Sequence, residues 1–127
     1  MLSGENMSDF DQTTKLFKTL MHSGRLEILD VLRSGEACVC HLEAALGYRQ
    51  AYISQQLSVL RAAGLIQDRR DGWNIYYRVV QPNIYTVIDA AQSAAGGSRS
   101  ASRRKSILSA VDGCSCPHCS PLEKVTA

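Results

Sequence analysis

The sequence predicts a mainly α-helical domain with one small β-hairpin. Apolar residues recur at helical spacing through the first half of the chain, and the spacing then changes around an Asp-Gly pair that is typical of a hairpin turn. The chain has 127 residues, of which 45% are apolar and 20% are charged, so it can bury one modest core. No run approaches the ~20 apolar residues that a membrane span needs.

Four helices are predicted ahead of the hairpin, each with apolar residues three or four positions apart. Ser23 is expected to cap the second helix, and glycines are expected to end the later ones. In the fourth helix, Ile53, Leu57 and Leu60 mark the buried face. The predicted helices run over about 9–21, from 23 to the Ser34-Gly35 pair, over 39–46 and over 50–63.

A hairpin and a last helix follow these four helices. Residues 65–69 and 75–80 have strand composition, and Asp71-Gly72 lies between them. Pro82 suits the first turn of a helix that is predicted over about 82–95. This order places a hairpin directly after a helix with a polar face.

The composition changes after residue 95. Gly96-Gly97 and a run of Ser, Ala, Arg and Lys predict a flexible linker, which leads to three cysteines. We therefore expect residues 1–95 to form the folded domain and residues 96–127 to form a flexible, basic tail with a cysteine cluster.

Charge is unevenly distributed along the chain, although the net charge is only +2. Residues 1–46 carry four basic and seven acidic groups, whereas residues 47–80 carry five Arg and two Asp. A basic segment of this kind suits a face that meets a polyanion, and an ordinary mixed surface is the alternative explanation.

Two short helices, a turn with glycine, a polar-faced helix and a hairpin form a winged helix-turn-helix pattern. The fourth helix carries amide and hydroxyl side chains opposite its apolar face, and such groups read base edges in the major groove. Arginines beside this helix and beside the hairpin turn can hold phosphates. Taken singly, each of these residues is explained as well by a solvated side chain. The predicted DNA-binding residues are Arg49, Gln50, Tyr52, Ser54, Gln55, Ser58, Arg61, Arg69 and Arg70.

Short motifs occur in a fixed order along residues 9–95. They are Leu16-Phe17-Lys18-Thr19-Leu20, Gly24-Arg25-Leu26-Glu27-Ile28-Leu29, Glu36-Ala37-Cys38-Val39-Cys40-His41-Leu42, Ile53-Ser54-Gln55-Gln56-Leu57, Leu60-Arg61, Gly64-Leu65, Arg70-Asp71-Gly72 and Tyr76-Tyr77-Arg78. Together they resemble the ArsR/SmtB family of metal-responsive repressors. The resemblance implies a homodimeric winged helix-turn-helix protein that binds double-stranded operator DNA and represses a promoter until an inducer binds.

The first and last helices carry more apolar residues than a domain of this size needs for its own core. The resemblance implies that these helices build the dimer, and we expect them to pair across a two-fold axis. The residues concerned are Phe10, Leu16, Phe17, Leu20, Ile84, Tyr85 and Ile88.

The five cysteines are expected to be reduced, because the polar, acidic start of the chain shows no secretory signal and predicts a cytoplasmic protein. Thiolates bind soft ions such as As(III), Cd(II), Pb(II) and Zn(II). Cys38 and Cys40 share one face only in an extended segment, which Gly35-Glu36-Ala37 would allow at a non-helical start. Taken alone, these residues favour two buried apolar thiols. The resemblance favours ligation, because Glu36–Leu42 is similar to the family's Glu-Leu-Cys-Val-Cys-Asp-Leu box.

Two thiols do not complete a metal site. Glu43 stands where some family members have a third cysteine, the first 20 residues contain none, and the last helix has Asp89 but no His for the family's separate zinc site. The tail is therefore expected to complete the site, and His41 is a further candidate. The predicted ligands are Cys38, Cys40, Cys114, Cys116 and Cys119.

These inferences predict a transcriptional repressor that releases operator DNA when thiolates bind As(III), Cd(II), Pb(II) or Zn(II). One alternative is a thiol redox switch in the same fold. Another is a tail-based thiol-disulfide oxidoreductase or metal carrier, because Cys116–Cys119 is similar to the active-site tetrapeptide of thioredoxin-fold enzymes. Its flanks, Gly113 and Ser120-Pro121, lack the strand and helix which that chemistry needs. No Ser-His-Asp set or phosphate-binding glycine loop is visible, so no enzyme is predicted.

Overall fold

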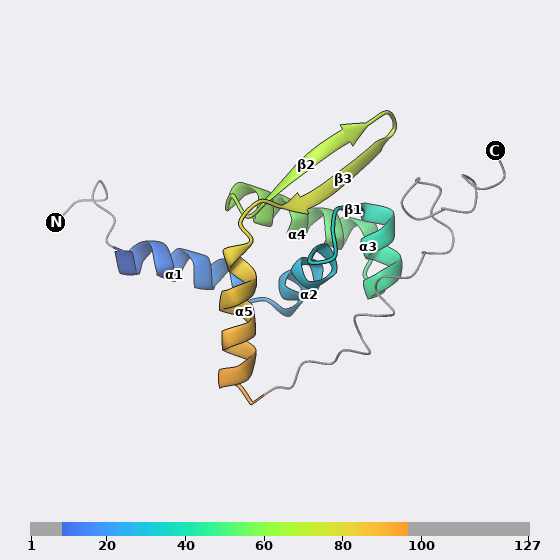
Figure 1. The fold of residues 1–127 in the computed structure, drawn as a ribbon. Helices are drawn as coiled ribbons and strands as arrows, with labels where there is room; N and C mark the ends of the chain where they lie inside the picture. The colour runs from blue at the N-terminus through green and yellow to red at the C-terminus, as the bar shows by residue number, and fades with distance from the viewer. Residues whose placement is uncertain (1–8, 97–127) are drawn as a thin grey trace.

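The computed structural model describes residues 9–96 as a helical domain with a three-stranded antiparallel sheet (Figure 1). The predicted mainly α class with a small hairpin is confirmed. Predictions for residues 97–127, among them the tail and Cys114, Cys116 and Cys119, lie outside the described residues. None of the described helices is both long and apolar enough to cross a membrane. The elements are α1 (Asp9–Leu20), α2 (Ser23–Leu32), β1 (Ala37–Cys38), α3 (Val39–Leu46), α4 (Gln50–Ala62), β2 (Ile66–Asp71), β3 (Asn74–Val79) and α5 (Asn83–Ala94).

The hydrophobic core lies where α2, α3 and α4 meet the base of the hairpin. Ile28, Leu29, Leu42, Ile53 and Leu60 are completely inaccessible to solvent. Burying one such side chain contributes about 1.5–3 kcal/mol. The core therefore holds α4 by its apolar face and leaves the opposite face of this helix directed outward.

A tight turn connects α3 to α4. Gly47 ends α3 in the left-handed region (φ 79°), and its N–H donates to the carbonyl of Glu43 (2.8 Å). Arg49, two residues later, is already the N-cap of α4. The predicted boundaries of α3 are confirmed, and the short turn holds α3 against α4.

A two-residue strand that the sequence pattern does not reveal precedes α3. In β1, Ala37 lies opposite Tyr77 and Cys38 lies opposite Tyr76, so the strand order is β1-β3-β2. Two residues are too few to show the alternation by which a strand is recognised, and the pairing partner lies far along the chain. The segment before α3 is therefore extended as far as Cys38 and is part of the sheet, but Cys40 already lies in the first turn of α3. The expectation that both cysteines share one extended segment was wrong, because the helix begins at Val39, between them.

The prediction that Ser23 caps α2 was wrong. His22 is the N-cap, with extended backbone (φ −163°, ψ 115°) and no hydrogen bond from its side chain to the helix. The N–H of Leu26 donates to the carbonyl of His22 (3.1 Å), so Ser23 is already the first helical residue. The start of α2 is therefore set by the backbone hydrogen bond from Leu26 to His22 and not by a side-chain cap.

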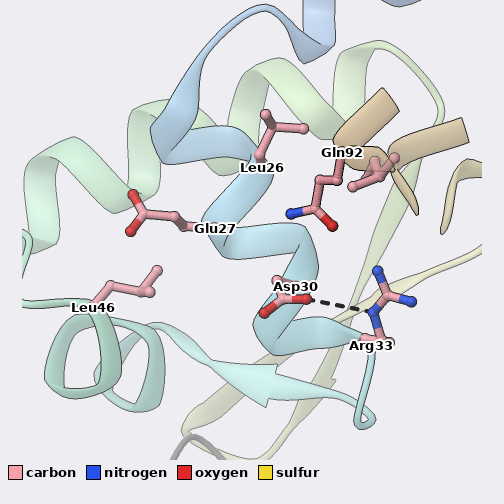
Figure 2. A pocket seen from close by; sticks show the side chains of 7 residues that line it. Leu26, Glu27, Asp30, Arg33, Leu46 and Gln92 are labelled. Carbon is pink, nitrogen blue, oxygen red and sulfur yellow. Dashed lines mark ion pairs between the residues drawn. The ribbon is translucent and has the colours of Figure 1, made fainter. Parts of the chain in front are cut away.

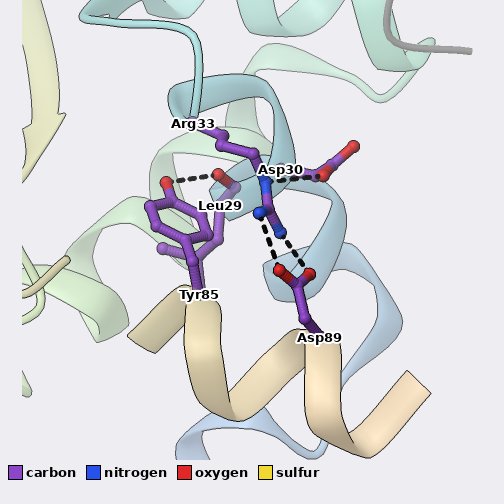
Figure 3. A network of polar contacts seen from close by, with 5 residues as sticks. All are labelled: Leu29, Asp30, Arg33, Tyr85 and Asp89. Atoms are coloured by element: carbon purple, nitrogen blue, oxygen red, sulfur yellow. Dashed lines mark hydrogen bonds and ion pairs between the residues drawn. The ribbon is translucent and has the colours of Figure 1, made fainter. Parts of the chain in front are cut away.

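A polar network fastens α5 to α2 (Figure 3). Arg33 donates two hydrogen bonds to the carboxylate of Asp89 (3.1 and 2.9 Å), and its Nε lies 3.4 Å from Oδ1 of Asp30. Its guanidinium lies over the ring of Tyr85 (4.4 Å), whose hydroxyl donates to the carbonyl of Leu29 (2.7 Å). The hydrogen bond with Asp89 raises the pKa of Arg33, and burial raises the pKa of Tyr85, so the network keeps these protons into the alkaline pH range.

Helix α1 extends away from the body of the domain (Figure 1). Leu20 is its one buried residue, whereas Phe10, Phe17 and the adjacent Met21 are exposed. A helix of 12 residues is marginally stable in water without a partner surface. We therefore expect another protein surface to pack against the exposed apolar residues of α1.

An apolar groove of about 340 Å³ lies between the end of α1 and α5. Phe17, Met21 and Val87 are among the residues that line it. Of the residues expected to form a dimer, the structure assigns Leu20, Ile84 and Ile88 to the core of this domain, and it leaves Phe10 and Phe17 exposed. The surface left for a second copy is thus narrower than the sequence pattern suggests.

Candidate nucleic-acid interface and cysteine pair

Helix α4 presents one continuous polar face. Its buried residues, Ile53, Gln56, Leu57 and Leu60, point into the domain. Six of the nine predicted DNA-binding residues lie exposed along α4 and its N-cap. These are Arg49, Gln50, Ser54, Gln55, Ser58 and Arg61.

Gln56 is the buried polar residue of α4, and it fixes the helix to its neighbours. Its Oε1 accepts a hydrogen bond from Nε of Arg25 (2.8 Å). Arg25 also donates to the carbonyl of Thr19 (3.1 Å). One guanidinium therefore joins the end of α1, the start of α2 and the middle of α4, which holds the exposed face of α4 in a fixed orientation.

Tyr52 has a packing role that the sequence did not reveal. Its side chain is half-buried, with its ring centroid 4.7 Å from that of Tyr48 and its hydroxyl 3.4 Å from Nδ1 of His22. The ring also lies against Gly24, where an added Cβ would collide with the hydroxyl oxygen and lie 3.1 Å from two ring carbons. This packing explains the position of the Tyr52 ring, and its predicted contact with DNA stays a prediction.

Replacing Gly24 with Ala is expected to destabilise the domain by about 1–3 kcal/mol, because the added methyl group overpacks against Tyr52. In the Tyr52→Phe background the same change should cost at least about 1 kcal/mol less, since the colliding oxygen is gone and Ala favours a helix over Gly. Urea unfolding of the four proteins at one concentration measures this difference. Equal costs in both backgrounds would show that Tyr52 does not occupy the space above Gly24.

The hairpin β2–β3 forms the wing, and its arginines differ in their surroundings. Arg70 is exposed and makes no ion pair with another described residue. Arg61 pairs with Asp68 at the surface (3.4 Å). Arg69 donates through two nitrogens to the carboxylate of Glu36, which raises its pKa, so the structure gives this predicted phosphate contact a protein partner.

Trp73 is a candidate that sequence reasoning missed. It is the one tryptophan of the chain, and it lies fully exposed at the tip of the wing, next to the turn residue Gly72 (φ 63°). A large apolar ring at the tip of a protruding hairpin suits contact with sugars or base edges in a groove. The signal in the sequence was its place directly after Asp-Gly.

Cys38 and Cys40 lie on the two sides of the junction between β1 and α3. Cys38 is buried and is the N-cap of α3, where its sulfur accepts a hydrogen bond from the backbone N–H of His41 (3.4 Å). Cys40 is half-buried within the first turn of the helix, and both thiols are free of disulfides. Two soft donors suit thiophilic ions. Among residues 9–96, no group of three or more His, Cys, Asp or Glu side chains is arranged to hold a metal ion.

A cavity between α2, α3 and α5 is too small for an organic effector (Figure 2). Its volume is about 100 Å³, and its lining includes Leu26, Glu27, Asp30 and Gln92. Sites for drug-sized ligands usually enclose about 300–1,000 Å³. Figure 2 shows Asp30 directed toward Arg33, its ion-pair partner, and Glu27 accepts a hydrogen bond from the hydroxyl of Tyr48, so both acidic residues of the lining already have protein partners.

Sequence comparisons relate this chain to bacterial regulators. The family model described as "Bacterial regulatory protein, arsR family" matches residues 22–68. The chain is similar to a biofilm growth-associated repressor of Agrobacterium fabrum, with 44% identity over 75 residues that cover 59% of this chain and 64% of the relative, just under two thirds of its length. It is also similar to the arsenic resistance transcriptional regulator ArsR1 of Pseudomonas putida, with 39% identity over 88 residues and 68% coverage of each protein.

Solved structures share the same arrangement of elements. The transcriptional repressor BigR from Xylella fastidiosa has a TM-score of 0.62 and 34% identity, over 66% of this chain and 86% of that one. A homodimeric winged helix-turn-helix DNA-binding domain from Mycobacterium bovis, from a possible ArsR-family regulator, has a TM-score of 0.63 and 30% identity, over 76% and 89%. The predicted winged helix-turn-helix class is confirmed.

Proposed function

Because this chain belongs to the ArsR family of bacterial transcriptional regulators, which are not enzymes, we propose that it represses transcription by binding operator DNA and releases that DNA when its cysteines capture an inducer. One observation carries the DNA-binding half of this proposal. The exposed face of α4 is polar from Arg49 to Arg61, and the arginine-bearing wing follows it directly. We expect the protein to act in the cytoplasm, where its operator lies.

In the proposed interface, one set of side chains reads bases and another set binds phosphates. The amide and hydroxyl groups of Gln50, Ser54, Gln55 and Ser58 would read base edges, because α4 is of a size that the major groove admits. Guanidinium groups at the ends of α4 and on the wing would hold phosphates. The cations assigned to that role are Arg49, Arg61 and Arg70.

Replacing Arg70 with Ala is expected to weaken binding to all DNA sequences and to reduce the salt dependence of binding by about one unit of slope, because one phosphate contact is lost. Replacing Gln55 with Ala is expected to change sequence preference instead, by about 1–3 kcal/mol at one base pair. Fluorescence anisotropy with operator and shuffled duplexes at several salt concentrations separates the two effects. Lys15→Ala, which removes an exposed cation from α1, is the matched control. Unchanged operator affinity in both variants would contradict this assignment.

The single tryptophan allows the wing to be followed in solution by its fluorescence. In free protein, Trp73 should emit as a solvated indole and be readily quenched by acrylamide, because it is fully exposed. On operator binding we expect its emission to change and its acrylamide quenching to fall at least twofold. Replacing Trp73 with Ala should weaken operator binding without changing the fold by circular dichroism. Equal quenching in free and bound protein would exclude Trp73 from the interface.

We propose a homodimer as the repressing form. The exposed apolar residues of α1 and the groove beside α5 support pairing of these helices across a two-fold axis. Two copies of α4 would then reach successive major grooves about 34 Å apart. The homodimeric state of the Mycobacterium bovis domain is consistent with this arrangement.

For the inducer, we propose a thiophilic ion held by Cys38 and Cys40 together with one or more of Cys114, Cys116 and Cys119. The donor set favours As(III), Cd(II) or Pb(II), with Zn(II) as a harder alternative. The same thiols support the alternative of a redox switch, in which a disulfide from Cys38 or Cys40 to the tail replaces the ion.

One titration distinguishes these two inducers. Reduced protein bound to operator is titrated with As(III), Cd(II), Pb(II) and Zn(II), and thiolate charge-transfer absorbance and DNA release are recorded together. Oxidation of metal-free protein in a chelating buffer is the second arm. Release in step with an ion supports metal sensing, release on oxidation alone supports the redox switch, and no release in either arm would refute the proposed induction.

A further inference from the structure

The segment that carries Cys38 is tied to the wing by a closed ring of contacts. Glu36, two residues before Cys38, accepts hydrogen bonds from Nε (3.1 Å) and a second nitrogen of Arg69 on β2. The guanidinium of Arg69 lies over the ring of Tyr76 on β3, 4.9 Å from its centroid. Tyr76, in turn, is the register partner of Cys38 in the sheet. The ring therefore runs from Cys38 through Glu36, Arg69 and Tyr76 back to Cys38.

This ring differs from the surface ion pair between Arg61 and Asp68 of the same strand, and Arg69 also lies 3.9 Å from Oδ2 of Asp71. Arg61 and Asp68 meet at one contact of 3.4 Å, with side chains 52% and 40% exposed. The side chains of Arg69 and Glu36 are 44% and 21% exposed, and two nitrogens of Arg69 donate to the carboxylate of Glu36, a geometry that fixes orientation as well as distance. Tyr76 beneath it is almost completely buried. The ion pair of Glu36 and Arg69, here called the clamp, therefore rests on the buried ring of Tyr76, whereas the pair of Arg61 and Asp68 does not.

The strand that closes the ring is short. β1 contributes only two register pairs to the sheet, and the clamp beside it is a second connection between this segment and the wing. A change of backbone conformation at Cys38 would move Glu36 and the pairing with Tyr76 together. The wing is the element that would follow, because Arg69 and Tyr76 lie on its two strands.

We propose that Glu36 and Arg69 are positioning residues that set the orientation of the wing and transmit a change at Cys38 to it. This inference rests on the proposed function, since it concerns how inducer capture weakens DNA binding. Arg69 then affects DNA binding indirectly, by orienting the wing, whereas Arg70 contacts a phosphate directly. Capture of an ion at Cys38 alters β1, β1 carries Glu36 with it, and the wing loses the orientation in which its tip and Arg70 reach DNA.

The test compares Glu36→Gln with Asp68→Asn, which removes the same charge from β2 and breaks only the surface pair with Arg61. The measured quantity is the ratio of operator Kd with and without Cd(II). Wild-type protein and Asp68→Asn should both show a ratio of about 5–150. In Glu36→Gln the ratio should fall at least threefold below that of wild type, while Cd(II) affinity and stoichiometry without DNA stay the same.

Hydrogen exchange of the wing gives a readout that needs no DNA. Cd(II) should raise amide exchange over residues 66–79 in wild type, whereas in Glu36→Gln exchange should already be raised and respond little. If Glu36→Gln keeps the wild-type ratio and the wild-type exchange response, the clamp does not transmit the change and the inference is wrong. If wild type itself binds Cd(II) but shows a ratio of one, the proposed induction fails, and the inference fails with it.

Discussion

Replacing Phe17 with Glu is expected to convert the protein to a monomer and to weaken operator binding by about a thousandfold. Phe17 is 54% exposed on α1 and lines the apolar groove beside α5, so a charge there would have to be desolvated in the dimer. A monomer keeps one recognition helix and loses the second half-site. Its affinity should then approach the non-specific range, which is typically about 10³-fold or more weaker than specific binding. Sedimentation velocity and operator anisotropy measure the two effects.

Gln12→Glu is the matched control for this substitution. Gln12 is exposed on the same helix, about 140° around the axis from Phe17, and the change adds the same charge. It should leave both mass and operator affinity unchanged. A Phe17→Glu protein that remains dimeric and binds operator as wild type would place the dimer contact elsewhere on the molecule.

Replacing Cys40 with Ser is expected to leave repression intact and to abolish induction. Cys40 is only half-buried, and it is not the cap of α3, so its replacement should not disturb the fold. Operator affinity without ion should stay within about twofold, while the loss caused by Cd(II), about 5–150-fold in wild type, should disappear. Ala44→Ser, which adds a hydroxyl group to an exposed position of the same helix, is the control and should respond as wild type.

Ion affinity in wild type should also fall as the pH drops below ~8.5, because protons compete for thiols whose ordinary pKa has that value. Replacing Cys114, Cys116 and Cys119 together with Ser tests whether the tail completes the site. An unchanged affinity and stoichiometry in this triple variant would refute tail ligation, and His41, Glu43 or solvent would then complete the site.

The helices could be predicted from the sequence because their signals are local. The spacing of Ile53, Leu57 and Leu60 and the glycine at position 47 each act within a few residues, and the structure confirms both. β1 could not be predicted, since its two residues acquire their strand character from Tyr76 and Tyr77, about 40 residues later. The N-cap of α2 was predicted wrongly because Ser23, whose side chain is typical of an N-cap, comes one position after the observed N-cap, His22.

The residues of the candidate interface were likewise predicted where the signal is local and missed where it depends on distant parts of the chain. The outward residues of α4 follow from helical spacing alone, so Gln55 and its neighbours were found where the sequence placed them. The partner of Arg69 lies 33 residues earlier in the chain, and Tyr52 packs against residues from two other segments. Such contacts depend on tertiary structure, which no periodicity encodes. Trp73 was missed for a different reason, because an exposed position gives no pattern.

The sulfur of Cys38 already has a task before any ion arrives. It accepts the N–H of His41 and so closes the first turn of α3, a position at which other helices use an oxygen of Ser, Thr, Asp or Asn. A thiolate sulfur has three lone pairs, so an ion can bind this sulfur on a side that the N–H of His41 leaves open, and the cap restricts the direction from which the ion approaches. One ligand of the proposed site is thus oriented by the start of a helix before the ion arrives.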